Sequence, residues 1–464
     1  MGRSIDARNI FWINVFTVVA FSGRSIWQQS ILSNYVYLVA DNNASIVGFL
    51  TGILGLSQVL SSVPTGVLGD ILPKHYLLRV SAVITLGAIA VNVYAVHNGS
   101  LQALAVAMTL WGISWGIAYT TTEALFASSV AGGQRSKFMT RKQTLLQLST
   151  CLGPIVAGGM FVYLGNTWTT EDCAIVLIVG NLVCLPLCFI LFRMREEKKK
   201  EDEKGEEVQE VGNFLNEESF ETKSEDEKSR RVVLTMSNRK IALAIALADL
   251  LSGLASGMSI RYFPVFFLDD VMLSPLVVQI LYLLSSLGCV VCSVTNQRLS
   301  HKYGRSETTI ASKWVGISFM ILMIQSQTWW NSPKWVISTL YVLRTSFMNS
   351  SKALTKSQLM DVVDPKHRAK WSILESVNAF SWSGSAAIGG LLVESYSLIF
   401  NFYVTATMQF VATLPLFLLW GLPSEERQSV FESEGDLGAP LLGEDDKDDN
   451  RGRDDRGRDD DKMP

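Results

Sequence analysis

Chemical groups that carry out catalysis or hold metals are scarce in this chain, which has only six cysteines and four histidines among its 464 residues. Cys289 and Cys292 have the spacing of a metal-binding pair, but no second pair and no nearby histidine accompanies them, so we interpret them as small apolar packing residues. The sequence contains no Walker A loop, no HExxH zinc motif and no nucleophile elbow. We therefore expect neither an enzyme nor an ATP-driven pump, with no cofactor, no metal and no nucleic-acid partner.

Charged residues are also sparse over most of the chain, because they concentrate in residues 195–240 and after residue 423. Hydrophobic residues make up 48% of the sequence. Apolar runs longer than about 18 residues recur, which is the length that a helix needs to cross a bilayer. The start of the chain is polar, and the apolar run that follows is too long for a signal-peptide core, so we expect no cleaved signal. The composition predicts an all-α integral membrane protein.

The apolar runs predict twelve transmembrane helices, and the charges of the loops support this number. Loops rich in Lys and Arg alternate without a break with loops that hold Asp, Glu or Asn, or a lone Lys334. By the positive-inside rule, the basic loops and both termini face the cytosol. The predicted spans lie near residues 10–40, 44–69, 76–97, 101–131, 138–164, 172–194, 239–268, 273–298, 306–327, 334–360, 371–396 and 400–422.

The predicted spans fall into two groups of six. Residues 1–194 form the first expected bundle and residues 239–422 the second. Residues 195–238 are a linker rich in Glu and Lys with few aromatic residues, which we expect to be largely disordered or loosely helical. Residues 423–464 end in repeats of Arg, Gly and Asp and are expected to form a disordered cytosolic tail.

A short pattern occurs once in each group, about 230 residues apart. The first copy includes Glu123-Ala124-Leu125 and Gly158-Gly159, and the second includes Lys352-Ala353-Leu354 and Gly389-Gly390. A repeat of this length in a membrane protein indicates two homologous bundles, and such repeats place a binding site at their interface near the bilayer midplane. The repeat therefore predicts a transporter.

The chain resembles the major facilitator superfamily over residues 9–422. Gly66-Val67-Leu68-Gly69-Asp70 fits the first part of the superfamily's loop after helix 2, although Ile71 and Pro73 replace its basic residue and its later glycine. Gly304-Arg305 supplies that glycine-basic pair in the matching loop of the second half. The resemblance implies the major facilitator fold, two six-helix bundles around a cavity lined largely by helices 1, 4, 7 and 10, and secondary transport by alternating access.

Helix 5 carries Gly153-Pro154 and then Gly158-Gly159, which resembles a signature of antiporters in this superfamily with Ala157 at one glycine position. This resemblance favours antiport or export. The second half repeats the glycines as Gly384 and Gly389-Gly390, so close packing of helices is an equally good interpretation. Both interpretations stay open.

Polar side chains in the expected cavity helices are the candidate site residues, since ionisable groups in a membrane usually have a partner or a function. Arg24 and Gln28 lie one turn apart on helix 1, Trp115 and Tyr119 one turn apart on helix 4, and Arg344 near the middle of helix 10. We expect these residues to contact substrate, with structural ion pairs and aromatic packing as the alternatives. Basic residues outnumber acidic ones in these helices, which favours an anion or a zwitterion that carries a carboxylate or phosphate.

Asp249 lies near the middle of helix 7 and is the candidate proton carrier. Ser252, Ser256 and Ser259 continue along the same helical face. The alternative role of Asp249 is an ion pair with a basic residue of a neighbouring helix. Arg261, near the other end of this helix, is expected to extend to the lipid headgroups rather than to bind substrate.

Four charged residues near the cytosolic helix ends are expected to form a gate. They are Asp70, Glu123, Lys352 and Glu375. We interpret them as ion-pair partners that are made and broken as the two halves rock, rather than as direct substrate ligands.

These observations predict a secondary transporter of a small polar or anionic solute, coupled to protons and monomeric, with the lipid bilayer and a small-molecule substrate as its partners. An exporter of hydrophobic or cationic compounds is the first alternative. The second is a transporter-like receptor or scaffold, against which the charges in the cavity helices argue. Asp436 before Leu441-Leu442 resembles an acidic dileucine signal, so a vacuolar or lysosomal membrane is considered beside the plasma membrane.

Overall fold

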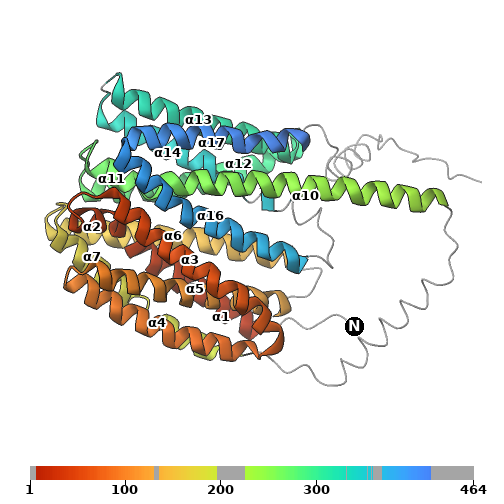
Figure 1. Cartoon of the computed structure of the whole chain (residues 1–464), viewed down its shortest axis with the longest axis horizontal. Coiled ribbons are helices and arrows are strands. Elements are labelled where there is room, and N and C mark those ends of the chain that lie inside the picture. Colours follow the sequence, from red (N-terminus) through yellow and green to blue (C-terminus); the bar gives the residue numbers. More distant parts are fainter. Residues whose placement is uncertain are drawn as a thin grey trace, which may run out of the picture. The chain divides into compact units, whose positions relative to one another are not determined.

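The computed structural model describes residues 7–129, 135–195, 225–330, 332–352, 354–356, 358 and 368–419. These residues form helices joined by short turns, and no strand occurs among them. Figure 1 shows the helices packed side by side as one bundle with their axes roughly parallel. The expected all-α membrane fold is confirmed, and its reason is physical, because a helix satisfies its own backbone hydrogen bonds where no water can.

The first half of the chain makes six rods, two of which are interrupted. α1 and α2 together make the span Arg8–Val39, with a break at residues 29 and 30. α7 and α8 make the span Thr170–Arg193. The helices are α1 (Ala7–Gln28), α2 (Ile31–Val39), α3 (Ala44–Ile71), α4 (Lys74–His97), α5 (Leu101–Ser129), α6 (Arg135–Leu164), α7 (Thr170–Leu182) and α8 (Pro186–Arg193).

The second half repeats this plan, including a broken first rod. α10 and α11 make the span Leu243–Leu268, interrupted at residues 261 and 262 just before Pro264. Proline has no backbone N–H to continue a helix, so a new helix starts at this position. The helices are α10 (Glu225–Ile260), α11 (Phe263–Leu268), α12 (Pro275–Tyr303), α13 (Arg305–Thr328), α14 (Lys334–Ser350), α16 (Arg368–Ser395), α17 (Leu398–Thr413) and the 3-10 helix η3 (Leu414–Leu419).

Ten segments of the described chain are long and apolar enough to cross a membrane. α14 and α16 are not among these ten. Both nevertheless pack within the bundle, α14 against α12 and α13, and α16 against α3 and α10. With these two helices the bundle has the twelve expected rods. The first turns of α10, from Glu225, fall within the segment 195–238 that was expected to be a linker. Residues 196–224 and the predicted tail lie outside the described residues.

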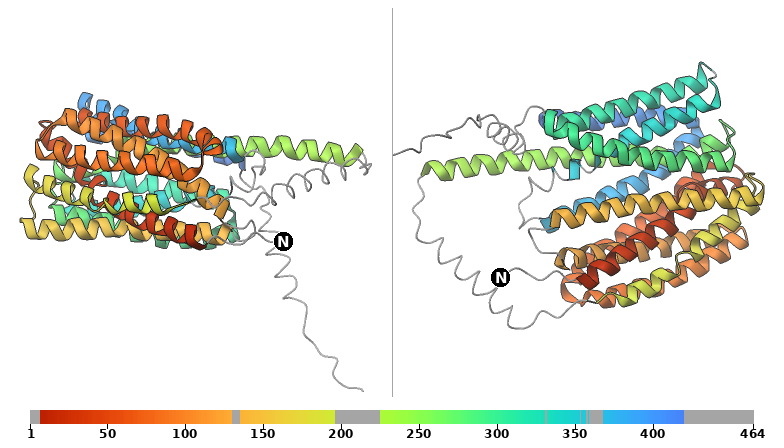
Figure 2. Two further views of the ribbon diagram at one scale, coloured as in Figure 1. Left: turned by 90° about the horizontal axis from the view of Figure 1, so that it is seen from below. Right: turned by 180° about the vertical axis from the view of Figure 1, so that it is seen from behind.

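The two halves meet through α3 against α16 and through α6 against α12. Two glycines of α3 allow the first contact, because a Cβ at Gly48 would overlap the backbone carbonyl of Ala386 and a Cβ at Gly55 would overlap Ser383. Small residues of this kind let helix backbones approach closely in membranes. Figure 2 shows the bundle of roughly parallel helices from two further sides.

Hydrogen bonds between the halves gather at one end of the bundle, which we call the acidic end because Asp41, Glu171 and Asp269 lie there. α2, α7 and α11 mark this end in Figure 1, and the N-terminal part of α10 extends from the other, basic end. The bonds run from Tyr37 Oη to Asp269 Oδ2 (3.1 Å), from Trp168 Nε1 to the Leu273 carbonyl (2.7 Å), from Leu276 N to Asn166 Oδ1 (2.9 Å) and from Gln279 Nε2 to Ser30 Oγ (2.9 Å). The acidic end is therefore closed.

Candidate functional site

The structure brings together Arg24, Gln28 and Trp115, three of the candidate site residues. Arg24 donates a hydrogen bond from Nε to Oε1 of Gln28, one turn along α1. Its guanidinium carbon lies 4.3 Å from the centroid of the Trp115 ring, which is a cation–π contact. Arg24 occupies the middle of its span and its side chain is nevertheless part-exposed.

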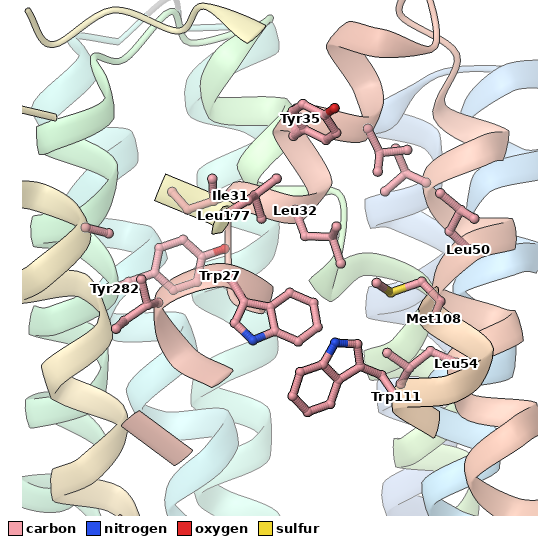
Figure 3. Close-up of a cluster of buried hydrophobic side chains, with 14 of the residues drawn as sticks. Trp27, Ile31, Leu32, Tyr35, Leu50, Leu54, Met108, Trp111, Leu177 and Tyr282 are labelled. Atoms are coloured by element: carbon pink, nitrogen blue, oxygen red, sulfur yellow. The ribbon is translucent and has the colours of Figure 1, made fainter. Parts of the chain in front are cut away.

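Three aromatic residues follow one another at intervals of four along α5 and serve two roles. They are Trp111, Trp115 and Tyr119, and we call them the aromatic stripe. Tyr119 stacks on Trp115 with 6.1 Å between ring centroids, and Phe21 meets the same indole edge-on at 5.4 Å. Phe21 and Tyr119 therefore pack against the ring that contacts the Arg24 guanidinium. Trp111 instead packs in the apolar core against Trp27 at 5.3 Å (Figure 3). Trp111 therefore serves packing, whereas Trp115 also contacts the Arg24 guanidinium.

Arg261 corrects one expectation. Instead of extending to the headgroups, its side chain is only 7% exposed and donates from Nη1 to the backbone carbonyl of Gln28 at 2.6 Å. Its guanidinium also lies 5.5 Å from the Trp382 ring. The break at residues 261–262 places Arg261 outside the regular helix. Its acceptor belongs to the last residue of α1, where backbone carbonyls lack helical partners.

Arg344 completes the basic set of the site. It is 4% exposed on α14, and its guanidinium lies 4.8 Å from the Phe263 ring. Tyr282 of α12 interacts electrostatically with both Arg344 and Arg261, and Arg261 in turn interacts with Arg24. We call the three arginines and Tyr282 the arginine cluster, and its two halves are linked by the hydrogen bonds of Arg24 and Arg261 to Gln28.

Several buried polar atoms in this cluster have no hydrogen-bond partner within the described chain. They are Nε of Arg261, Nε of Arg344, the hydroxyl of Tyr282 and the hydroxyl of Ser285. The Tyr282 ring packs edge-on against Tyr341 at 6.0 Å between centroids. A buried polar group without a partner costs about 1–3 kcal/mol. Buried groups of this kind normally bind water or a ligand.

Asp249 lies beside a residue that the sequence analysis missed. Lys313 on α13 is 5% exposed, interacts electrostatically with Asp249 and Lys352, and donates to Ser252 Oγ at 2.9 Å. The signal was present, because a lysine in the middle of an apolar run is costly and marks a function or a partner. Lys313 lies on α13, outside the helices 1, 4, 7 and 10 that the resemblance assigns to the cavity.

The serine face of α10 contacts helices of its own half. Ser252 accepts the Lys313 bond, and Ser256 accepts from Gln409 Nε2 of α17 at 2.8 Å. Ser259 is fully buried. The face that carries Asp249 is thus bound to α13 and α17.

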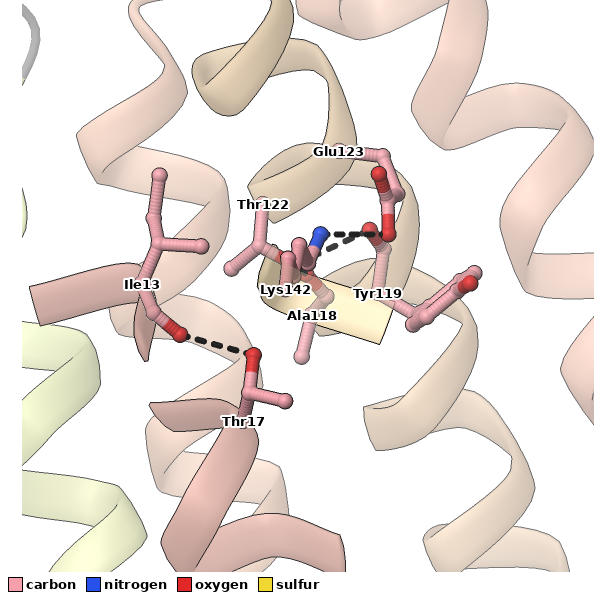
Figure 4. Close-up of polar contacts among 7 residues, drawn as sticks. All are labelled: Ile13, Thr17, Ala118, Tyr119, Thr122, Glu123 and Lys142. Carbon is pink, nitrogen blue, oxygen red and sulfur yellow. Dashed lines mark hydrogen bonds and ion pairs between the residues drawn. The ribbon is translucent and has the colours of Figure 1, made fainter. Parts of the chain in front are cut away.

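The expected gate residues are placed only in part. Glu123 pairs with Lys142 at 2.6 Å between Oε1 and Nζ, and both belong to the first half (Figure 4). This ion pair therefore does not cross between the halves. The Lys352 side chain is exposed on the second half. The side chains of Asp70 and Glu375 lie outside the described part of the chain.

The glycines of helix 5 contact neighbouring helices. A Cβ at Gly153 would overlap Ser25 of α1, and Gly158 faces Gln279 across the interface between the halves. This geometry supports the packing interpretation of the Gly-Pro motif.

Comparison with known proteins agrees with the fold. The chain matches the family description "Major Facilitator Superfamily" over residues 13–248 and 245–445. Among solved structures, it is similar to a bacterial homologue of the iron transporter ferroportin in the inward-facing state, with 13% identity, a TM-score of 0.65 and coverage of 90% of this chain and 100% of that one. A D-xylose-proton symporter matches with 13% identity, a TM-score of 0.64 and coverage of 91% and 99%.

The nucleoside transporter NupG is also similar, with 11% identity, a TM-score of 0.60 and coverage of 89% of this chain and 100% of that one. No curated protein sequence matches the chain. At these identities the structural matches show the fold, while the family match covers both halves. The chain belongs to the Major Facilitator Superfamily and is a membrane-embedded secondary transporter.

Proposed function

We propose that this transporter carries a small anionic solute and binds it at the arginine cluster. The observation that carries the proposal is the set of Arg24, Arg261 and Arg344, which come from α1, from the break between α10 and α11, and from α14. None of the three pairs with a carboxylate within the described chain. Arginine supplies up to five N–H donors in a fixed fork that suits carboxylates and phosphates. The free energy of these charges in a membrane is lowered when an anion arrives.

The position of the cluster supports alternating access. Arg24 and Gln28 belong to the first half, and Arg261 and Arg344 to the second, so a ligand held by both sets lies at the interface of the halves. Interfaces between repeats are where transporters of this architecture bind substrate. Because the acidic end is closed by hydrogen bonds between the halves, we expect this conformation to exchange substrate at the basic end, which the positive-inside rule assigns to the cytosol.

Proton coupling is proposed at Asp249. Lys313 and Lys352 interact electrostatically with this carboxylate. A change in these distances between conformations would change the proton affinity of Asp249, which is the requirement for coupling. Asp249→Asn should abolish the pH dependence of net uptake and still allow exchange of substrate, since exchange moves no net proton.

The charge of the site disfavours the alternative of an exporter of cations, because three arginines repel a cation in a low-dielectric interior. No observation favours a receptor or scaffold over a transporter.

Uptake into proteoliposomes tests the proposal. We expect anions to be taken up in preference to cations and neutral sugars, and Arg344→Ala to lower the apparent affinity by about tenfold or more, since a hydrogen bond to a charged group contributes about 1.5–3 kcal/mol. Arg344→Lys keeps the charge and loses the fork, so it should weaken affinity while the pH dependence remains. Arg193→Ala is the control, because Arg193 lies over Phe189 on the exposed flank. Preference for cations or uncharged solutes would contradict the proposal.

A further inference from the structure

Four buried polar groups of the second half have unused hydrogen-bonding capacity. They are Nε of Arg261, Nε of Arg344 and the hydroxyls of Tyr282 and Ser285, and none has a hydrogen-bond partner in the described chain. We propose that they form a subsite for an oxyanion that carries two negative charges, such as a dicarboxylate or a phosphate monoester. This inference rests on the proposed function and names its substrate class.

The burial of the four groups supports a built site. Arg261 is 7% exposed, Arg344 4%, Tyr282 6% and Ser285 4%. Ser285 follows Tyr282 by one turn of α12, so the two hydroxyls lie on the same face of this helix. Ring contacts link Tyr282 to Arg344, because Tyr341 packs against both the Tyr282 ring and the Phe263 ring, and the Arg344 guanidinium lies over Phe263. Arg261 precedes Phe263 by two residues in the chain, so the four groups belong to one neighbourhood of the second half.

The charge of the ligand follows from the charge of the site. A single negative charge would leave one of the two guanidiniums of the second half unbalanced in the membrane interior. Arg24, which interacts electrostatically with Arg261, adds further positive charge from the first half. A dianion balances Arg261 and Arg344 and accepts hydrogen bonds from both. The rings of Trp382 and Phe263 lie against these two guanidiniums and exclude water from one side of each, which strengthens the attraction.

The kind of ligand follows from the hydrogen-bonding groups. Guanidinium groups donate and do not accept. An acceptor-rich oxyanion matches the two arginines, whereas a sugar brings many hydroxyl donors that they cannot satisfy. The site is therefore suited to carboxylate or phosphoryl oxygens rather than to a neutral polyol.

Ligand binding to the purified full-length protein in detergent tests the inference. The probes are succinate and methyl phosphate as dianions, acetate as the monoanion and xylose as the neutral solute, all at equal ionic strength. We expect the dianions to raise the thermal unfolding midpoint and to bind at least about tenfold more tightly than acetate, because each charged hydrogen bond adds roughly this factor. If acetate binds as tightly as the dianions, the inference is overturned while the proposed function stands. If xylose binds and no anion does, both are overturned.

Two tyrosine variants test the role of Tyr282. Tyr282→Phe removes a buried hydroxyl that has no hydrogen-bond partner in the described chain. Without ligand, the unfolding midpoint should therefore be unchanged or higher. The affinity for the dianion should fall about tenfold. Tyr262→Phe is the matched control, because the Tyr262 hydroxyl donates to the Ala386 carbonyl at 2.6 Å within the second half. This control should lower the midpoint and leave affinity unchanged. Wild-type dianion affinity in Tyr282→Phe would remove this hydroxyl from the site and overturn the subsite.

The pH dependence of affinity separates the two sources of a dianion. The second pKa of a phosphate monoester is about 6, so its binding should weaken as the pH falls from about 7.5 to about 5.5. Binding of succinate should weaken less and at a lower pH, because its second carboxyl titrates below the second proton of a phosphate monoester. Tighter binding of either dianion than of acetate supports the subsite. Which of the two dianions binds more tightly then identifies the ligand group as a carboxylate or a phosphoryl group.

Discussion

Arg261 of the second half donates a hydrogen bond from Nη1 to the backbone carbonyl of Gln28 in the first half, at 2.6 Å. Gln28 also accepts a bond from Arg24 through its side chain. One residue of α1 therefore holds two arginines that belong to different halves. Any movement that separates the halves at this level must break the bond to Arg261 and free that guanidinium for another partner.

Loss of this bond should favour opening of the acidic end. In Arg261→Ala, we expect a cysteine introduced as Ser45→Cys to react about tenfold faster with a maleimide in detergent, because a hydrogen bond to a charged group contributes about 1.5–3 kcal/mol. Ser45 lies at the interface, where its hydroxyl donates to the Gly390 carbonyl. Arg193→Ala in the same cysteine background should react at the parent rate. Equal rates in both variants would show that the bond does not hold the halves together.

Close approach of α3 and α16 should be sensitive to a single methyl group. A Cβ at Gly48 would overlap the Ala386 carbonyl, so Gly48→Ala should force the helices apart and lower stability by about 1–3 kcal/mol. Gly66→Ala on the same helix is the control, because a Cβ at that position meets nothing within 4 Å. Thermal unfolding in detergent measures the difference. An equal effect of both substitutions would mean that helix propensity, and not packing, decides the outcome.

Lys313 and Asp249 should behave as a coupled pair. Lys313→Met removes a buried charge that interacts with Asp249, and Asp249→Asn removes the opposite charge. We expect the double variant to be less destabilised than the sum of the single variants, with a coupling free energy of about 0.5–3 kcal/mol. A double-mutant cycle on unfolding measures this value. If the effects of the two single variants on the free energy of unfolding simply add, Lys313 and Asp249 do not interact.

Asp270, in the turn after α11, should make stability depend on pH. Burial and the neighbouring Asp269 raise the pKa of Asp270 above its usual value. A carboxyl whose pKa is higher in the folded state stabilises the fold while it is protonated. This contribution is complete below the unfolded pKa of about 3.9 and is lost as the pH rises through the raised folded pKa.

Unfolding midpoints measured between about pH 4 and pH 7 check this prediction, since the relevant window begins near the unfolded pKa of about 3.9. Asp270→Asn should flatten the decline of the midpoint with rising pH. Asp41→Asn, an exposed position at the same end, is the control and should retain the wild-type slope. A wild-type slope in Asp270→Asn would assign the pH dependence to other groups.

The sequence predicted the rods and part of the site for identifiable reasons. Apolar length and alternating loop charge predict helices, and spacing of four residues on one helix predicted that Arg24 and Gln28 would meet. Arg261 was expected at the headgroups because it lies near the end of its predicted span. The structure instead buries it, because the break at residues 261–262 turns the chain, and hydropathy does not predict such a break. Lys313 could have been found as a lysine within a predicted span, but its partners could not, because its contact with Ser252 joins helices that are distant in sequence. Such contacts depend on how helices pack, and no local pattern encodes them.

The breaks at residues 29–30 and 261–262 have a mechanical consequence. Each separates a short helix from the long helix before it, so that α2, with 9 residues, and α11, with 6 residues, follow α1 and α10 after a break in the helical backbone. These two short helices contact each other at the acidic end, and most of their residues are buried. Opening of this end must therefore separate buried apolar side chains of both short helices in addition to breaking the hydrogen bonds between the halves.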